Sequence, residues 1–335
     1  MGSYALSALT RQGLEAYKKQ IATINGAENF ATTIEVQPAR QQTLIDRYQQ
    51  QTDFLKRINI VQVQQATADK LGLGSDKRAA SNTDTRIQPR RPTPIGNLEH
   101  IDDYVCTQTD YDVAYMWAVI DQWGAFPDFQ KRLQNLAIKL VAQDKQMIGF
   151  NGTHRAKTTN KTLYPKLQDV NVGWLEKIRA FAPERHIDSL TIGASHEFKN
   201  IDALVEMAVN DLIAEQFRDN SDLVVITSRG LVTDKYQNLI NQTLAPTEQA
   251  AANALYQKKQ LGTLPVDTPA YFPTNGLLIT SYDNLSIYQQ RGSMRRLIKD
   301  EPEWNRTSDY QSVNECFVVE DYDKCAYIEN LVIEA

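Results

Sequence analysis

The chain has 335 residues, of which 42% are hydrophobic and 23% are charged, and its formal net charge at pH 7 is -5. This length and apolar content are sufficient for one large core or two smaller ones. The acidic balance argues against tight nucleic-acid binding over the whole surface, because such binding depends on clustered lysine and arginine. No apolar run approaches the ~20 residues that span a bilayer, and residues 1–10 lack the basic start of a secretory signal.

The first third of the chain is predicted to alternate helices with extended segments. Apolar residues at helical spacing indicate an amphipathic helix that Asn25-Gly26 would end. An extended segment over 30–37 and a second helix over 40–56 follow. Residues 58–63 then alternate like a strand. The residues that define the first helix are Leu6, Leu9, Leu14, Tyr17, Ile21 and Ile24.

Residues 64–100 form a polar excursion without clear periodicity, and strands are predicted after it over 104–107 and 111–115. Structureless loops longer than ~15 residues are uncommon inside compact domains. A two-stranded arm is marginal in water by itself, so it would need a partner subunit, whereas a plain surface loop would not. Four arginines in this segment are predicted to pair with carboxylates of another subunit, because no aromatic residues lie among them to stack on bases. They are Arg78, Arg86, Arg90 and Arg91.

The strongest predicted helix begins at Phe126-Pro127 and runs to 149, a length of more than about 30 Å. A short helix over 169–181, a helix capped by Asn200, a buried strand over 223–226 and a helix after Ser228 indicate an α/β unit over 170–265. The remainder is rich in predicted strands, and Asp321-Tyr322-Asp323 is expected to turn the last two into a hairpin. These strands span 277–280, 285–288, 295–298, 313–319 and 326–333.

Three widely spaced cysteines, Cys106, Cys316 and Cys325, fit neither a disulfide framework nor a zinc site. Cys316 and Cys325 could face each other across the expected hairpin. Free thiols in the core are the favoured interpretation, because unpaired cysteine behaves as a small apolar residue. The pattern therefore indicates synthesis in a reducing cytoplasm.

No motif in the sequence predicts catalysis, a cofactor or a metal site. His196-Glu197 begins like a zinc-protease motif, but Asn200 occupies the position of the second histidine. Gly72 and Gly74 lack the spacing of a phosphate-binding loop, and Ser228 has no GxSxG setting. We therefore expect a protein that is not an enzyme and that binds no cofactor.

Short runs spread along the chain resemble the major capsid proteins of P-two-type tailed phages, the peduoviruses. These runs occur in the family's order from about Ile34 onward, and together they are specific although no single one is diagnostic. The most telling is Leu167-Gln168-Asp169-Val170-Asn171-Val172-Gly173-Trp174-Leu175. The others include residues 52–61, 83–85, 149–152, 222–226, 234–236, 271–273, 284–288 and 318–322.

The resemblance implies an α+β chain with the Hong Kong 97-type capsid fold. That fold has an extended N-arm, a long β-hairpin called the E-loop, a peripheral domain with a spine helix and an axial α/β domain. The expected divisions are an assembly segment at 1–33, the N-arm at 34–58, the E-loop at 59–110, the peripheral domain at 111–169 and 276–335, and the axial domain at 170–275.

The resemblance also implies a function: a major capsid protein that self-assembles as pentamers and hexamers into an icosahedral phage head around double-stranded DNA. The expected location is the virion, after assembly in the cytoplasm of the host bacterium. The expected partners are an internal scaffolding and maturation protease, a portal at one vertex, and packaged DNA held by weak non-specific contacts, with no membrane. The protease would remove the assembly segment by cleaving within Phe30, Ala31, Thr32, Thr33 and Ile34.

Two readings from other classes remain open at this point. One is a cytoplasmic α/β enzyme in which residues 64–100 are an active-site lid over a polar pocket. The other is a DNA-binding tail component with a one-sided basic face. Within the capsid reading, Lys70 and Lys77 lie in the long loop without a cross-linking signature, so a non-covalent shell is expected.

Overall fold

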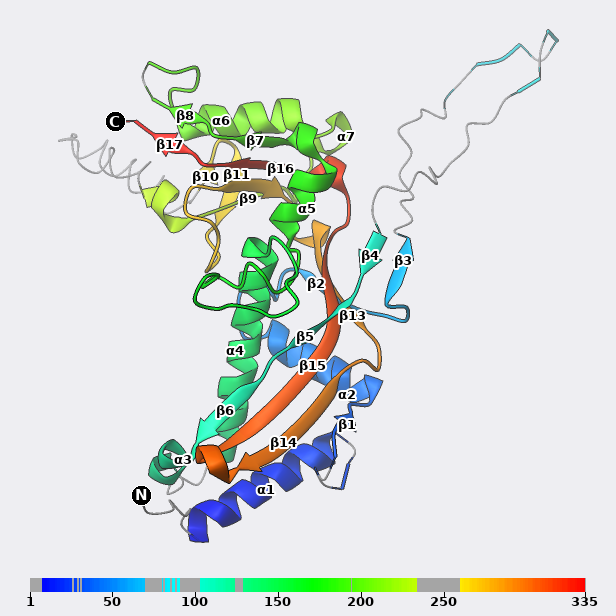
Figure 1. Cartoon of the computed structure of the whole chain (residues 1–335). Helices are drawn as coiled ribbons and strands as arrows, with labels where there is room; N and C mark the ends of the chain where they lie inside the picture. Colours follow the sequence, from blue (N-terminus) through cyan, green and yellow to red (C-terminus); the bar gives the residue numbers. More distant parts are fainter. Residues whose placement is uncertain are drawn as a thin grey trace, which may run out of the picture.

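The computed structural model shows an elongated molecule in which one β-sheet lies alongside a long helix, α4 (Phe129–Asn151), and a second β-sheet lies beyond one end of that helix (Figure 1). Among the described residues, no helix combines the length and apolarity that crossing a membrane requires. The structure describes residues 8–25, 27–28, 30, 32–69, 80, 82–84, 86–87, 89–90, 103–123, 129–193, 195–233 and 260–334.

The first sheet is built around one strand, β15 (Arg306–Val319), which is 14 residues long. Neighbouring strands pair with it on both edges over most of its length, and all of its residues are buried or half-buried. The sheet order is β1-β14-β15-β13-β2, and β5 and β6 also pair with β15. The bounds are β1 Ile34–Glu35, β2 Asn59–Val63, β5 Thr107–Asp110, β6 Val113–Met116, β13 Leu285–Gln290 and β14 Arg295–Glu301.

The second sheet has the order β10-β11-β9-β12-β16-β7 and combines parallel and antiparallel pairs. Its central strands β9 (Val224–Thr227) and β12 (Leu277–Thr280) are buried at every position, as continuous apolar runs require. The other bounds are β7 His186–Asp188, β10 Gln260–Leu261, β11 Leu264–Asp267 and β16 Ala326–Glu329. Near it, β8 (Thr191–Ile192) pairs with β17 (Val332–Ile333).

Helices cover both sheets. In the first half, α1 (Ala8–Ile24), α2 (Pro38–Gln49) and α3 (Trp117–Trp123) pack against the first sheet or α4. In the second half, α6 (Ile201–Met207) continues into a π-helical turn, and Asn200 caps it by accepting from the Ala203 N–H at 2.8 Å. The remaining helices are α5 (Trp174–Phe181) and α7 (Glu215–Arg218).

The main core cluster lies where α4 and α5 meet the first sheet. Trp174 is fully buried there and its indole N–H donates to the Ser286 carbonyl at 2.9 Å. The α4 backbone comes so close at Gly149 that an added Cβ would lie 2.2 Å from the Trp174 ring. α5 begins only at Trp174, later than in the helix predicted over 169–181, because the backbone of Gly173 is extended and its N–H donates to the Gly152 carbonyl at 3.0 Å.

The expected hairpin between the last two long strands is wrong. β15 ends in the first sheet, whereas β16 pairs with β12 and β7 in the second, so the turn at 322–324 crosses between sheets. The physical reason is that β12 is buried on both faces and needs a partner on each edge. For the same reason, sheet pairing groups 277–280 and 326–329 with the strands of 170–275, which differs from a division at residue 276.

Other predicted elements keep their type with shifted bounds. The helix predicted over 40–56 begins at Pro38, a favourable first position, and ends at Gln49. After Ser228, the chain is helical up to Thr233, and the rest of that predicted helix lies outside the described residues, as does Pro127.

Candidate functional site at the root of the long loop

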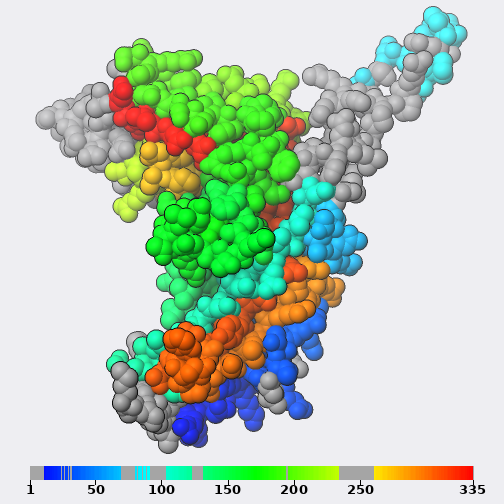
Figure 2. Space-filling model, viewed as in Figure 1, coloured from blue at the N-terminus to red at the C-terminus, as the bar shows by residue number. Residues whose placement is uncertain are grey.

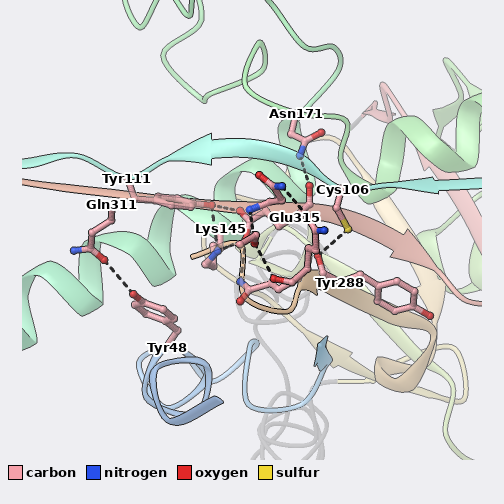
Figure 3. Close-up of polar contacts among 12 residues, drawn as sticks. Tyr48, Cys106, Tyr111, Lys145, Asn171, Tyr288, Gln311 and Glu315 are labelled. Atoms are coloured by element: carbon pink, nitrogen blue, oxygen red, sulfur yellow. Dashed lines mark hydrogen bonds and ion pairs between the residues drawn. The ribbon is translucent and has the colours of Figure 1, made fainter. Parts of the chain in front are cut away.

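A buried polar cluster fastens α4 to the central strand of the first sheet (Figure 3). The fully buried Glu315 carboxylate of β15 accepts hydrogen bonds from Lys145 of α4 and from the Tyr111 hydroxyl. Gln289 of β13 also donates to it, at 2.9 Å. The Asn171 side chain donates to the Glu315 backbone carbonyl at 3.1 Å. The cluster thus joins five separate segments of the chain.

The electrostatics of this cluster are those of a structural contact between α4 and β15 and not those of a catalytic site. Burial lowers the pKa of Lys145, and the Glu315 carboxylate opposes that effect. Burial and the same carboxylate raise the pKa of Tyr111 well above its usual range, so this hydroxyl remains a neutral donor. The adjoining cavity has a volume of about 10 Å³, which is space for about one water and not for a substrate.

A second buried ion pair lies farther along β15. Arg296 of β14 makes a two-pronged contact with Asp309, with Nε–Oδ1 at 2.9 Å and Nη2–Oδ2 at 2.5 Å. Gln311 donates to Asp309 at 3.3 Å. It also accepts from the Tyr48 hydroxyl of α2 at 3.4 Å (Figure 3). This pair therefore connects α2 with the sheet, as the Lys145 cluster connects α4.

The long excursion leaves the body on a short two-stranded root. Here β3 (Thr67–Asp69) pairs with β4 (Asp103–Val105). The described residues between 80 and 90 lie far from the body (Figures 1 and 2). Arg86 and Arg90 are exposed there, and the Arg86 backbone N–H donates locally to Asp84 at 2.9 Å. Arg78 and Arg91 lie outside the described residues, so the contacts predicted for the four arginines remain a prediction.

The N-terminal helix α1 packs on the outer end of the first sheet. Leu14, Tyr17 and Ile21 are each 1% exposed and contact a cluster that includes Tyr115 and Ile298. Lys18 also reaches Asp300 of β14 at 2.5 Å, which adds an ion pair to this apolar contact. α1 is therefore part of the folded body and not a loose tail.

The segment predicted to be cleaved connects α1 to β1. Thr32 and Thr33 are exposed, Phe30 is half-buried against the α1 cluster, and Ile34 pairs with Arg296 of β14. Ala31 lies outside the described residues. The exposed threonines leave this connection accessible on the surface, whereas the residues on either side are attached to the body.

His196 and Ser228, which the sequence did not assign to a metal or catalytic motif, make local structural contacts. His196 contacts Glu334 at 2.9 Å, and the Ser228 hydroxyl donates to the Thr274 carbonyl. Within the described ranges, no group of three or more histidine, cysteine, aspartate or glutamate side chains is placed to hold a metal ion.

Sequence reasoning missed the Lys145–Glu315 cluster. A signal was present, because Lys145 follows Val141 by four residues and precedes Ile148 by three, which puts it on the buried face of α4. A lysine at such a position usually pairs with a buried acid. The partner on a distant strand has no comparable signal in the sequence.

Comparison with known proteins identifies the relatives of this chain. Residues 13–331 match the family model for phage major capsid proteins of the P2 family. The capsid proteins of Escherichia phage P2 are 37% identical over 339 residues, which is 97% of this chain and 95% of the relative. The major capsid protein of Serratia phage KSP20 is 36% identical over 337 residues, with 96% and 97% covered.

Solved structures agree. The procapsid of satellite phage P4 that includes the size determination (Sid) protein contains a chain with a TM-score of 0.81 and 34% identity, with 98% of this chain and 99% of that chain covered. The cyanophage A-1(L) capsid matches with a TM-score of 0.51 at 12% identity, with 82% and 91% covered, a likeness of fold alone. The capsid fold expected from the sequence is confirmed. The chain belongs to the P2 family of phage major capsid proteins, structural subunits of the phage head.

Proposed function

We propose that this subunit assembles as pentamers and hexamers into a closed icosahedral head around double-stranded DNA, and that it acts without catalysis. The carrying observation is the long excursion between β3 and β4. Its root has three residue pairs, and its described residues between 80 and 90 are, except for the half-buried Thr83, exposed and far from the body. A two-stranded arm of this kind is marginal in water, so contacts with a neighbouring subunit would stabilise it.

Sheet pairing supports a division of labour within the subunit. We assign 34–58 to the N-arm, 59–110 to the E-loop, and 111–169 with 285–319 to the peripheral domain around the spine helix α4. The axial domain of 170–275 then also takes β12 and β16, which complete its sheet. The buried Lys145 and Arg296 pairs keep the peripheral domain rigid while its loop and arm reach outward.

Exposed arginines on the loop supply a direct test of assembly. In the variant Arg86→Ala/Arg90→Ala, two positive charges are lost at positions distant from the body. We expect normal folding with fewer closed shells, measured by electron microscopy and sedimentation. The matched control is Lys157→Ala/Lys166→Ala, which removes two exposed charges from the body loop after α4. Equal shell yields for both variants would contradict the role of the loop.

The N-terminal connection supports processing by an internal scaffolding and maturation protease. Cleavage among residues 30–34 requires an accessible backbone, and the exposed side chains of Thr32 and Thr33 agree with that. The measurement is the intact mass of the chain after production with the active protease, with an inactivated protease as the control. A new N-terminus outside this segment would contradict the assignment.

The remaining partners follow from the same proposal. A portal would replace one pentamer, and packaged DNA would meet a shell whose subunits carry a formal net charge of -5. That balance favours weak, non-specific contact with DNA, since tight binding requires many phosphate-neutralising cations.

A further inference from the structure

Two of the three cysteines lie on neighbouring strands at the root of the long loop. The sulfur atoms of Cys106 and Cys316 are 3.5 Å apart, and both residues are buried free thiols. In the antiparallel register of β5 with β15, Thr107 pairs with Glu315, so the next residue pair along the ladder is Cys106 with Cys316. The Cys106 N–H donates at 2.7 Å to Ala66, away from β15.

This position is suited to a covalent bond between the two strands. A residue whose N–H points away from the antiparallel neighbour belongs to a non-hydrogen-bonded pair, with Cα atoms about 4.5 Å apart. Disulfides join Cα atoms about 4.4–6.8 Å apart, so rotation of the two side chains would suffice without moving either strand. Cys325 lies apart from this pair: it is fully buried, and its thiol donates to the Tyr322 carbonyl at 3.1 Å.

We infer that Cys106 and Cys316 form a disulfide when the protein meets an oxidising environment, and that this bond staples the root of the long loop to β15. The bond would join two residues that are 210 positions apart in the sequence. It would hold the first residues after β4 against the central strand of the peripheral sheet. Its formation depends on the subunit alone, while its effect on assembled shells rests on the proposed function.

The oxidant we name is a small-molecule disulfide such as oxidised glutathione. The Cys106 thiol loses its proton to solvent, and its sulfur attacks one glutathione sulfur, which breaks the glutathione S–S bond and releases one glutathione thiolate. Cys316, deprotonated in turn, then attacks the Cys106 sulfur and releases the second thiolate, and both thiolates take up protons. Two protein thiols are oxidised and one glutathione disulfide is reduced, so atoms and electrons balance.

The surroundings of the two thiols indicate the route by which an oxidant would reach them. Tyr104 of β4 packs edge-to-face on Tyr288, with ring centroids 5.2 Å apart, beside the two sulfurs. Because Tyr104 belongs to the loop root, opening of that root would admit the oxidant.

The test counts thiols in the full-length chain, as soluble subunit and as shells, after incubation with oxidised glutathione. The protein is then denatured in the presence of a maleimide, which labels the free thiols, and its mass and disulfide-linked peptides are measured. We expect one labelled thiol of three in the wild type, a 106–316 linked peptide, and no labelling in Cys325→Ser. Cys106→Ser and Cys316→Ser should give no linked peptide, and the remaining thiol of the pair should be either labelled or bound to one glutathione. Tyr104→Ala should oxidise faster than the wild type, and hydrogen exchange of 103–110 should slow on oxidation except in Cys106→Ser.

Three labelled thiols in both the wild type and Tyr104→Ala after oxidation would overturn the inference, as would a link that joins two chains or includes Cys325. Linkage in the soluble subunit without any closed shells would instead uphold the bond and count against the proposed assembly. The two proposals are therefore separable in one set of samples.

Discussion

The buried ion pair between Lys145 and Glu315 makes the attachment of α4 to β15 sensitive to single substitutions. Lys145→Met would leave the Glu315 carboxylate buried with donors from Tyr111 and Gln289 but without its counter-charge. Removing one partner of a buried pair costs about 3–5 kcal/mol. We expect a loss of that size in the free energy of unfolding, measured by thermal melting of the purified chain.

The double variant Lys145→Met/Glu315→Gln separates charge from packing. It removes both charges while keeping similar volumes, so it should be more stable than Lys145→Met alone. The exposed Lys139 of the same helix is a matched control, and Lys139→Met should change the unfolding free energy by less than about 0.5 kcal/mol. A single variant as stable as this control would show that the pair is dispensable.

Glu301 predicts how stability depends on acid. Hydrogen bonds from Tyr310, Arg306 and Ser308 lower the pKa of this carboxylate from 4.5 to about 2. Because its folded pKa lies below the unfolded value, the stabilisation is present above pH 4.5 and is lost as pH falls toward 2. Glu301→Gln should therefore show a shallower fall in melting temperature between about pH 5 and about pH 2 than the wild type, whereas the exposed Glu303→Gln should follow the wild type. Parallel curves for all three proteins would contradict this assignment.

Residue identities alone predicted some of these details and missed others. The Asn200 cap could be predicted because a cap depends on residues three apart in sequence. The Cys106–Cys316 contact could not, because its register depends on how β5 meets a strand 210 residues away. The alternative of Cys316 facing Cys325 depended on a hairpin that the chain does not form, although the favoured interpretation of free thiols agrees with the structure.

Among the elements, the contact between α4 and α5 depends on a glycine. Gly149→Ala would place a methyl group 2.2 Å from the Trp174 ring, which is fixed by its hydrogen bond to Ser286. Overpacking of this kind costs about 1–3 kcal/mol. Gly13 in α1 is the matched control, because an added Cβ meets nothing within 4 Å there. Gly13→Ala should raise stability by about 0.5–1 kcal/mol, and a Gly149→Ala protein that also gained stability would show that α5 moves freely.

Elements with a strong local pattern were the predictable ones. The apolar periodicity of α1 and α4 and the continuous apolar runs of β9 and β12 are set by neighbours in sequence, and these elements form as predicted. The pairing partner of a strand is not set by its neighbours in sequence. β16 pairs with β12 rather than β15 because β12 is buried on both faces and needs a partner strand on each edge. The sequence does not indicate which edge of β12 lacks a partner.

At the scale of the whole molecule, the fold followed from many weak resemblances in order and not from any physical pattern by itself. Patterns alone left a lid-bearing enzyme open, since a long polar excursion between strands fits either reading. The two-sheet body with a projecting loop root, together with relatives that cover nearly the entire chain, favours the capsid subunit over the enzyme.

The N-terminal helix gives a prediction that involves the whole subunit. α1 contributes to a satellite cluster at the outer end of the first sheet, separate from the main core and from the core of the second sheet. A chain that begins at Ile34 should therefore still fold. It should also expose Tyr115, Trp117 and Ile120, bind more of an apolar fluorescent dye and melt at a lower temperature.

Leu14→Ala distinguishes docking of α1 from its mere presence. Leu14 is 1% exposed, and truncating such a side chain costs about 2–5 kcal/mol where the surrounding contacts are intact. This full-length variant should shift dye binding and melting in the same direction as removal of residues 1–33, whereas the exposed Lys19→Ala should shift neither. If the shortened chain matched the wild type in both measurements, α1 would not be docked in solution. The cleavage proposed above would then remove a free tail and leave the surface of the subunit unchanged.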